Sequence, residues 1–399
     1  MLMLDDVLEE KNISRALKRV IHNKGVGGVD NMSVDELTHF WEKYGDNIID
    51  NIRRELYVPQ PMMCMYISKK GGKKKRRLSI PTVLDRMIQQ AIMQKLAKEY
   101  GKEFDSHSFG YRKGKSTKDA LKLCLKYMNE GYEYVVDIDI EAFFDNVNHD
   151  ILLGLLRKRD IDEKLIRLIE KYIKYKILCG GRISKATKGI SQGSPLSPLL
   201  ANVLLNELDR FVTDNFLHHI RYADDILVMT ESEDIAVDVM WSIREFLMNI
   251  LLLDVNTEKS QIVKADKLEY MGYAFKKKDT GKYVLTINDN ISDKAIRRIE
   301  KHTNASMKDI VAWWNRIGSF NRGWLNYYKY ADDEDLIRTI RQIELKCDEF
   351  IEQRLVDISE NTDIDKETII YSIFDAKQFV NIKEWYEFLK NREDGFYDR

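Results

Sequence analysis

The chain has 399 residues, of which 44% are hydrophobic and 32% are charged, and its formal net charge at pH 7 is −1. This length is sufficient for two or three subdomains with buried cores. No apolar run approaches the roughly 18 residues of a membrane-spanning helix, and the N-terminal segment lacks the basic start of a signal peptide. We therefore expect a cytoplasmic protein with no membrane partner.

The charge is unevenly distributed along the chain. Residues 331–399 contain 19 acidic and 10 basic side chains, so residues 1–330 are net basic. A basic body is typical of proteins that bind a phosphate backbone. The acidic segment is expected to face solvent, a protein partner or the body itself. The four cysteines lack metal-ligand spacing and are expected to be reduced thiols.

Hydrophobic periodicity and the placement of glycine and proline predict elements along the whole chain. Helices are expected at residues 5–24, 33–57, 83–103, 116–130, 149–158, 162–175, 198–216, 233–251, 292–330 and 334–356. Strands are expected at residues 62–67, 77–80 and 133–140, in hairpins at 176–190 and 219–228, and within 261–287. No proline follows Pro198, so the last helices can be long.

Two segments place acidic side chains in runs that are typical of buried strands. Asp224 and Asp225 lead into the apolar run Ile-Leu-Val-Met. Asp137, Asp139 and Glu141 alternate with apolar residues, which puts them on one face of a strand. Two such strands side by side would build a carboxylate site for two metal ions. The alternatives are a solvated turn and a solvated edge strand, and Asp137 competes with Asp139 as the first metal ligand.

These segments carry a family resemblance. Residues 139–145, 191–198 and 222–225 resemble three successive motifs of reverse transcriptases, and most closely those of the group II intron-encoded type. Further segments resemble other regions of that group in the same order. Residues 23–30 resemble its N-terminal extension, residues 81–91 and then 107–116 its fingers, residues 269–273 its primer-gripping turn, and residues 322–328 its thumb. The resemblance covers about residues 5–330.

The resemblance implies an α+β fold, a right-hand polymerase with fingers, a palm with an antiparallel sheet, and a helical thumb. The fingers and palm would occupy residues 1–289 and the thumb residues 290–331, extending to about 356. Residues 332–399 would form an acidic helical C-terminal extension, which could serve homo-oligomer formation or contact a protein partner.

The resemblance also implies a set of site residues. The catalytic residues would be Asp139, Asp224 and Asp225, which together with the Ile140 carbonyl would hold two Mg²⁺ ions, with Mn²⁺ as a substitute. The nucleotide-binding residues would be Lys69, Arg76, Phe144, Gln192 and Gly193. The template- and primer-binding residues would be Arg112, Met271, Gly272, Arg322 and Trp324.

Four of these assignments have structural alternatives. Gln192 and Gly193 would lie against the nucleotide base, and their alternative is an ordinary polar loop before Pro195. Phe144 would exclude a ribose 2′-hydroxyl, and its alternative is ordinary core packing. Lys69 and Arg76 belong to a run with seven cations in nine residues, residues 69–77, whose alternative is a solvated surface. The tryptophans near residues 313–324 would either support bases by stacking or fill a helix-bundle core, and we expect a mixture.

The implied function is RNA-directed DNA synthesis from an RNA template, a DNA or RNA primer and dNTPs. Mobile intron proteins often carry a nuclease module after the thumb, with paired cysteines or histidines that bind metal, but no histidine follows His302. The last segment is also acidic, where intron proteins have a basic splicing segment. These departures favour an immobile enzyme, with antiphage defence alongside a dedicated noncoding RNA as the favoured role. The alternatives are a compact group II intron maturase and a catalytically retired RNA-binding protein.

Overall fold

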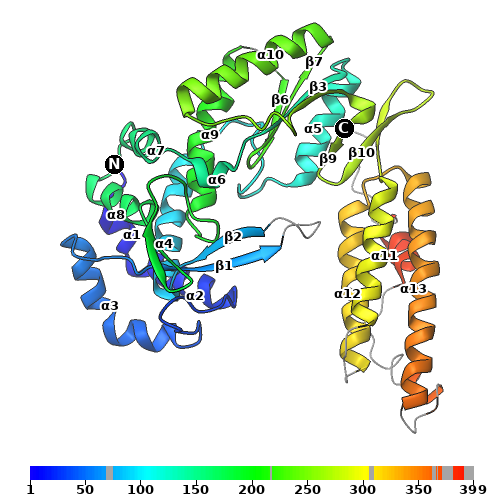
Figure 1. Ribbon diagram of the computed structural model, residues 1–399, viewed down its shortest axis with the longest axis horizontal. Helices are drawn as coiled ribbons and strands as arrows, with labels where there is room; N and C mark the ends of the chain where they lie inside the picture. Colours follow the sequence, from blue (N-terminus) through cyan, green and yellow to red (C-terminus); the bar gives the residue numbers. More distant parts are fainter. Residues whose placement is uncertain are drawn as a thin grey trace. The chain divides into compact units, whose positions relative to one another are not determined.

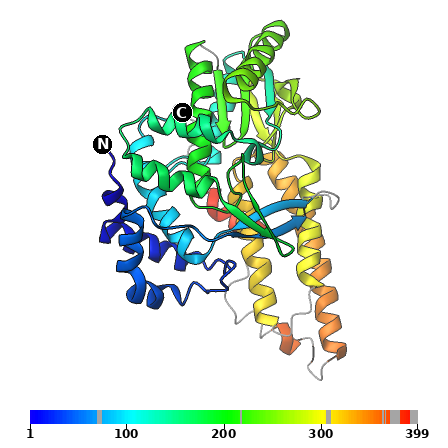
Figure 2. The ribbon, with the colours of Figure 1, turned by 60° about the vertical axis from the view of Figure 1, so that its left-hand side comes forward.

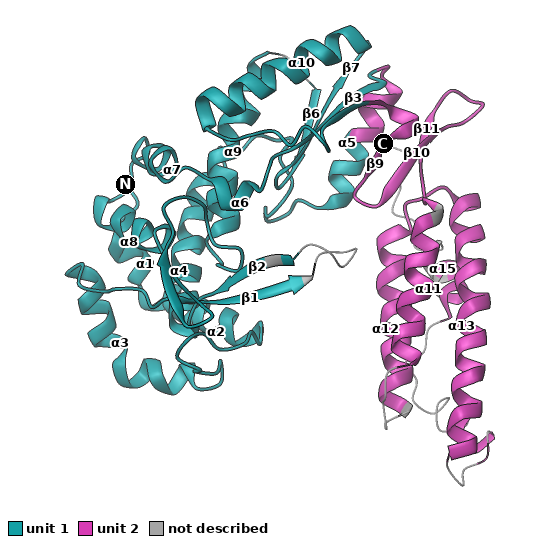
Figure 3. Cartoon of the chain, in the orientation of Figure 1, with its two compact units in different colours: residues 1–123, 132–262 teal, residues 124–131, 263–399 magenta. Residues whose placement is uncertain are grey.

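The computed structural model describes residues 1–68, 75–215, 218–304, 310–361, 365, 367–370 and 381–390. The chain forms two compact units (Figure 3). The first contains residues 1–123 and 132–262, and the second contains residues 124–131 and 263–399. The division thus falls before residue 289, where the sequence suggested the end of the palm. Within the described ranges, no helix is both long and apolar enough to cross a membrane.

Short strands alternate with helices along the chain (Figure 1). The helices are α1 (Leu4–Leu8), α2 (Glu10–His22), α3 (Leu37–Arg53), α4 (Val83–Tyr100), α5 (Thr117–Asn129), α6 (Phe143–Asn146), α7 (His149–Arg157), α8 (Glu163–Ile173), α9 (Ser197–Asp214), α10 (Glu233–Phe246), α11 (Asp289–Thr303), α12 (Ile310–Tyr328), α13 (Asp333–Asn361) and α15 (Ile382–Lys390). The strands are β1 (Met62–Ser68), β2 (Lys75–Ile80), β3 (Tyr134–Asp139), β4 (Lys176–Cys179), β5 (Arg182–Lys185), β6 (His218–Tyr222), β7 (Asp225–Thr230), β8 (Gln261–Lys264), β9 (Glu269–Tyr270), β10 (Tyr273–Lys277) and β11 (Tyr283–Thr286).

The palm sheet has the strand order β6-β7-β3-β8. Strands β3 and β7 run antiparallel, with Tyr134 opposite Thr230 and Asp139 opposite Asp225. The side chains of residues 226–229 are buried on both faces of β7, and α10 packs against β3 and β7. A short continuous apolar run of this kind is typical of a strand that is buried on both faces. This arrangement confirms the predicted α+β fold with an antiparallel palm sheet.

A second sheet in the first unit has the order β2-β1-β4-β5. Its pair β1–β2 agrees with the strands expected at residues 62–67 and 77–80, and its pair β4–β5 agrees with the hairpin expected within residues 176–190. Strand β1 pairs in parallel with β4, with Met63 opposite Leu178. This pairing brings Cys64 and Cys179 together as a disulfide, with their Cα atoms 5.0 Å apart. The expectation of four reduced thiols is therefore wrong for these two residues. They are 115 positions apart in sequence, and only the strand pairing makes them neighbours.

The second unit combines a small sheet, β11-β10-β9, with a helical bundle. Figures 1 and 2 show α11, α12 and α13 side by side, and α11 packs against both other helices. Helix α13 contributes buried side chains to this bundle, among them Leu336, Ile340 and Ile343. The first half of the acidic C-terminal segment is therefore an integral helix of the second unit.

Candidate active site

Four aspartates meet at one end of the palm sheet. Asp137 and Asp139 lie two positions apart on β3, and Asp139 faces Asp225 at the start of β7. Asp224 and Ala223 form the turn between β6 and β7, where Ala223 has the left-handed φ of 61°. The four carboxylates and Ile138 line a pocket of 290 Å³. Glu141, predicted on the same face, lies beyond the end of β3 and is exposed.

The carboxylates repel one another in a partly buried setting. Burial, followed by the negative charges of Asp137, Asp224 and Asp139, raises the pKa of Asp225 to about 7. Burial also raises the pKa of Asp137, although a hydrogen bond from Gln261 opposes the change. Such a group of acids is stabilised by a cation, because opposite charge favours the ionised form.

Lys259 supplies one positive charge to this group, and sequence reasoning missed it. Its Nζ lies 3.0 Å from Oδ2 and 3.1 Å from Oδ1 of Asp139. The two residues are 120 positions apart, and the segment from Asn256 to Ser260 contains no pattern that singles out this lysine. It is an internal counter-ion for Asp139 that a bound metal ion would have to share or displace.

A larger pocket of 810 Å³ adjoins the carboxylates. Its lining includes Asp139, Ile140 and Asp224, which were predicted to bind metal. The same lining includes three of the predicted nucleotide-binding residues, Phe144, Gln192 and Gly193. Lys75, Arg77 and Lys259 bring positive charge to the lining, where Arg77 is ion-paired with Asp145. Residues predicted separately for metal and nucleotide binding thus line a single cavity.

The loop that carries Gln192 and Gly193 is held against strand β2. The backbone nitrogen of Ser79 donates to the Gln192 carbonyl over 3.0 Å, and the Ser191 hydroxyl donates to the Ser79 carbonyl over 3.1 Å. Gly193 has φ of 133°, and a Cβ there would lie 2.6 Å from the Ser79 oxygen. Only glycine fits this position, so the backbone forms that part of the pocket wall.

A buried arginine supports the turn that carries the aspartate pair. The Arg221 guanidinium binds both carboxylate oxygens of Asp209 at 2.7 and 2.6 Å. Its Nη1 also donates to the Asn202 side chain and to the Ala223 carbonyl, each over 2.8 Å. Both charged side chains are essentially inaccessible to solvent. Arg221 therefore fixes the turn from behind, a role that its position next to the aspartates could have suggested.

Gly110 contacts the same turn from the loop between α4 and α5. A Cβ at Gly110 would collide with the backbone nitrogen of Ala223 and lie 2.9 Å from its Cα. The Asn202 side chain donates to the Gly110 carbonyl over 2.9 Å. The loop and the catalytic turn therefore pack backbone against backbone.

Three predicted residues of the first unit are not found in the described lining of this pocket. Lys69 lies outside the described residues. The backbone of Arg76 lies in β2 opposite Ile67, and its side chain is not among those described. The Arg112 guanidinium donates to the backbone carbonyls of Ser108 and Phe104 over 2.7 and 3.3 Å. Arg112 thus holds its own loop together, and its contact with template or primer stays a prediction.

The other template- and primer-binding candidates belong to the second unit. Met271 and Gly272 form the turn between β9 and β10 with φ values of 50° and 77°, and the Tyr327 hydroxyl donates to the Met271 carbonyl over 2.7 Å. Trp324 is buried in the helical bundle, whereas Arg322 on α12 is partly exposed. Trp313 is buried as well, and Trp314 is partly exposed. Two of the three tryptophans of α12 are therefore core residues, and base stacking or other nucleic-acid contact stays a prediction.

The palm sheet, with its aspartates beside a polar pocket, defines the fold as that of a right-hand polymerase. Residues 67–275 match the family model described as reverse transcriptase (RNA-dependent DNA polymerase). The chain belongs to this reverse transcriptase family.

Curated relatives agree with this membership. Group II intron-encoded protein LtrA of Lactococcus lactis is 38% identical over 197 residues, which is 49% of this chain and 33% of that protein. Protein YkfC of Escherichia coli is 32% identical over 165 residues, covering 40% of this chain and 43% of that protein. The retron Ec86 reverse transcriptase of Escherichia coli is 22% identical over 301 residues, covering 74% and 84%. The match to the first of these spans about a third of that relative's length.

Proposed function

We propose that this protein is an RNA-directed DNA polymerase that extends a primer on an RNA template. One observation carries the proposal. Asp139 and Asp225 are paired across β3 and β7, and Asp139 lines the same pocket as Phe144, Gln192 and Gly193. The expected substrates are dNTPs, an RNA template and a DNA or RNA primer.

The carboxylates suit a hard divalent cation. Mg²⁺ takes oxygen ligands, usually one or two carboxylates together with substrate phosphates. Burial, followed by the charges of Asp137, Asp224 and Asp139, raises the pKa of Asp225, and a bound cation would oppose this change. Asp139, Asp224 and Asp225, with the Ile140 carbonyl, would hold two Mg²⁺ ions, or Mn²⁺ in their place. When bound, such ions activate the primer hydroxyl and stabilise charge on the triphosphate.

The remaining pocket residues would select and orient the nucleotide. Lys75 and Arg77 bring positive charge to the pocket, which suits a triphosphate. The Phe144 ring packs against Phe143 with ring centroids 5.3 Å apart, and this support would hold it against the 2′ position of the sugar. Gly193 lets its loop lie directly against Ser79 of β2, where a Cβ would collide, and this packing would hold Gln192 and the loop backbone beside the nucleotide base.

Primer extension tests the proposal directly. Purified protein should extend a DNA primer on an RNA template with dNTPs and Mg²⁺, and Asp224→Asn with Asp225→Asn should abolish extension. The matched control is Asp238→Asn on the exposed surface of α10, which should extend normally. Undiminished synthesis by the double variant would refute the metal-site assignment. A wild-type protein inactive on every template would favour the catalytically retired RNA-binding protein.

For the biological role we propose antiphage defence with a dedicated noncoding RNA, with a compact intron maturase as the alternative. The support is the charge of residues 331–399, which contain 19 acidic and 10 basic side chains. Such a segment is poorly suited to grip RNA and would suit a protein partner or a second copy of the chain. Sequencing the RNA that copurifies with the protein distinguishes the roles: one recurrent noncoding RNA supports defence, and intron RNA supports the maturase.

A further inference from the structure

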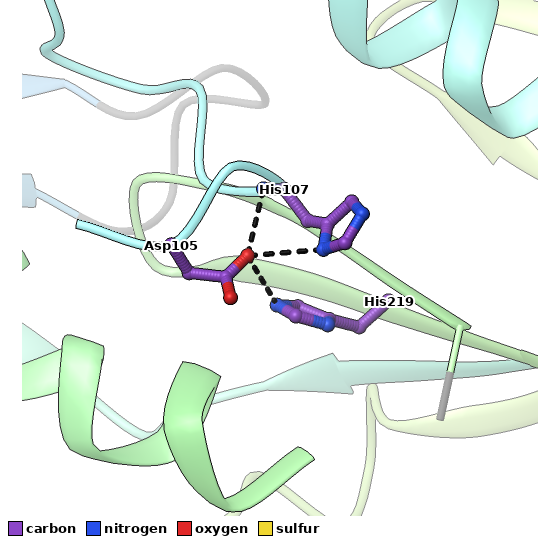
Figure 4. A group of neighbouring side chains, drawn as sticks. All are labelled: Asp105, His107 and His219. Carbon is purple, nitrogen blue, oxygen red and sulfur yellow. Dashed lines mark hydrogen bonds and ion pairs between the residues drawn. The ribbon is translucent and has the colours of Figure 1, made fainter. Parts of the chain in front are cut away.

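A group of metal-ligating side chains lies in the first unit outside the pocket described above. Asp105 and His107 belong to the loop between α4 and α5, and His219 belongs to β6. One ligand atom from each of the three lies within 4.8 Å of the other two, and Figure 4 shows the two imidazole rings turned toward the Asp105 carboxylate. We propose that Asp105, His107 and His219 form a binding site for a divalent transition-metal ion, with Zn²⁺ as the expected occupant.

The backbone explains why these residues meet. The Arg221 nitrogen donates to the His107 carbonyl over 2.9 Å, and the Phe109 nitrogen donates to the Arg221 carbonyl over 2.8 Å. The loop therefore pairs with β6 as a short parallel bridge between Ser108 and Arg221. His107 and His219 lie on adjacent backbones although they are far apart in sequence.

The distances fit tetrahedral coordination. Oδ1 of Asp105 lies 3.0 Å from Nδ1 of His107 and 3.6 Å from Nε2 of His219. With zinc–ligand bonds of 2.0–2.2 Å, a tetrahedral ion places its ligand atoms about 3.4 Å apart. These two separations bracket this value, and the ligand atoms of His107 and His219 lie within 4.8 Å of each other. Side-chain rotations that bring the two imidazoles closer would complete the coordination.

His219 gives an independent reason to expect a ligand. Its side chain is 1% exposed, and within the described part of the chain neither ring nitrogen has a hydrogen-bond partner. Its Nε2 lies 3.6 Å from a carboxylate oxygen of Asp105 and also of Asp209, which is beyond hydrogen-bond distance. Leaving a buried polar atom unsatisfied costs free energy, and a metal ion between Nε2 and Asp105 would remove that cost.

The types of ligand atom indicate which metal ion the site would bind. Two imidazoles and one carboxylate suit zinc and related transition metals, whereas Mg²⁺ prefers oxygen ligands in octahedral geometry. The three side chains leave a fourth position for water, and His107, 32% exposed, gives access from solvent. Asp209 is already bound through both oxygens to Arg221, so it would act as a neighbouring charge.

A bound ion would cross-link the α4–α5 loop to β6. This loop carries Gly110, which packs against the turn of the aspartate pair. The cross-link would therefore hold the loop in place behind that turn. The inference does not depend on the proposed polymerase function, since it concerns metal binding by a separate group of side chains.

The experiment measures zinc bound by the untagged full-length chain. The protein carries Asp224→Asn and Asp225→Asn, so that these two palm carboxylates do not contribute to binding. After chelation and dialysis it is equilibrated with Zn²⁺, and bound metal is measured by plasma mass spectrometry, with the shift in Tm as a second readout. We expect one zinc ion per chain and a Tm that rises with zinc concentration.

Ligand variants decide the assignment. His107→Gln and Asp105→Asn should each weaken zinc affinity at least about 10-fold, because changing a residue that only orients a metal ligand already costs that much. His39→Gln, on the exposed surface of α3, is the matched control and should bind zinc normally. Bound Co²⁺ should show the visible absorption of tetrahedral coordination in the control and lose it in the ligand variants. Substoichiometric zinc, or equal affinity in all variants, would overturn the proposal and leave the cluster as an ion-pair network.

Discussion

Replacing Asp225 with asparagine is expected to stabilise the metal-free protein while abolishing DNA synthesis. The pKa of Asp225 is raised from its ordinary 3.8 to about 7, first by burial and then by the charges of Asp137, Asp224 and Asp139. Each pKa unit corresponds to 1.36 kcal/mol, so the ionised carboxylate costs the folded state at most about 4 kcal/mol at pH 8. Because solvent screens a partly exposed group, we expect about 1–3 kcal/mol.

The pH dependence has a definite sign. Below about pH 4 the carboxyl is protonated in both the folded and the unfolded chain, so wild type and variant differ little. As pH rises from about 4 to 7, the unfolded chain releases a proton that the folded chain retains, and the wild type loses stability. The loss is complete above about pH 7. The advantage of Asp225→Asn should therefore appear between pH 4 and pH 7 and then stay constant.

The assay is thermal unfolding in the presence of a chelator across this pH range. The Tm of Asp225→Asn should exceed that of the wild type at pH 8 by about 2–4 °C per kcal/mol, while Asp238→Asn on α10 should match the wild type. Added Mg²⁺ should stabilise the wild type more than the variant, because the variant lacks a ligand. An Asp225→Asn protein no more stable than wild type at pH 8 would refute the account of the buried charge.

Three further substitutions test other parts of the site. Phe144→Ala should reduce the preference for dNTP over rNTP by about tenfold or more, measured as a ratio of kcat/KM values; an unchanged ratio would reduce Phe144 to core packing. Gly110→Ala should lower the extension rate about 100-fold by displacing the catalytic turn, while its circular dichroism stays unchanged. Gly154→Ala, with open space around its Cβ, should not lower the rate, and equal rates for the two variants would show that the turn tolerates the displacement. Lys259→Met should lower the Mg²⁺ concentration needed for half-maximal activity by up to about fivefold, as expected for an exposed ion pair, and a higher requirement would mean that the lysine assists metal binding.

Local sequence patterns predicted the strands and the acids they carry. The alternation around Asp137 and Asp139 and the apolar run after Asp225 identify two buried strands, and the structure pairs them with Asp139 opposite Asp225. Helix bounds such as Val83–Tyr100 and Ser197–Asp214 also agree closely with expectation. In these segments, local periodicity and tertiary burial favour the same conformation.

Features that depend on pairing between distant segments were missed. The contact between Lys259 and Asp139 spans 120 residues, and the disulfide between Cys64 and Cys179 spans 115. A single sequence does not show that β1 pairs with β4, or in which register, so it could not show that these cysteines are neighbours. The same limitation applies to His219, whose partners in the loop after α4 are identified only by strand pairing.

The buried Arg221 changes how a catalytic signature should be interpreted. Removing one partner of a buried ion pair typically costs 3–5 kcal/mol, and Arg221 also binds the Ala223 carbonyl within the turn itself. A relative that keeps the aspartate pair but has lost this arginine would present intact acids on an unsupported turn. Inspection of the acids alone would classify such a protein as active, so surveys for inactive reverse transcriptases should include the residue behind the turn.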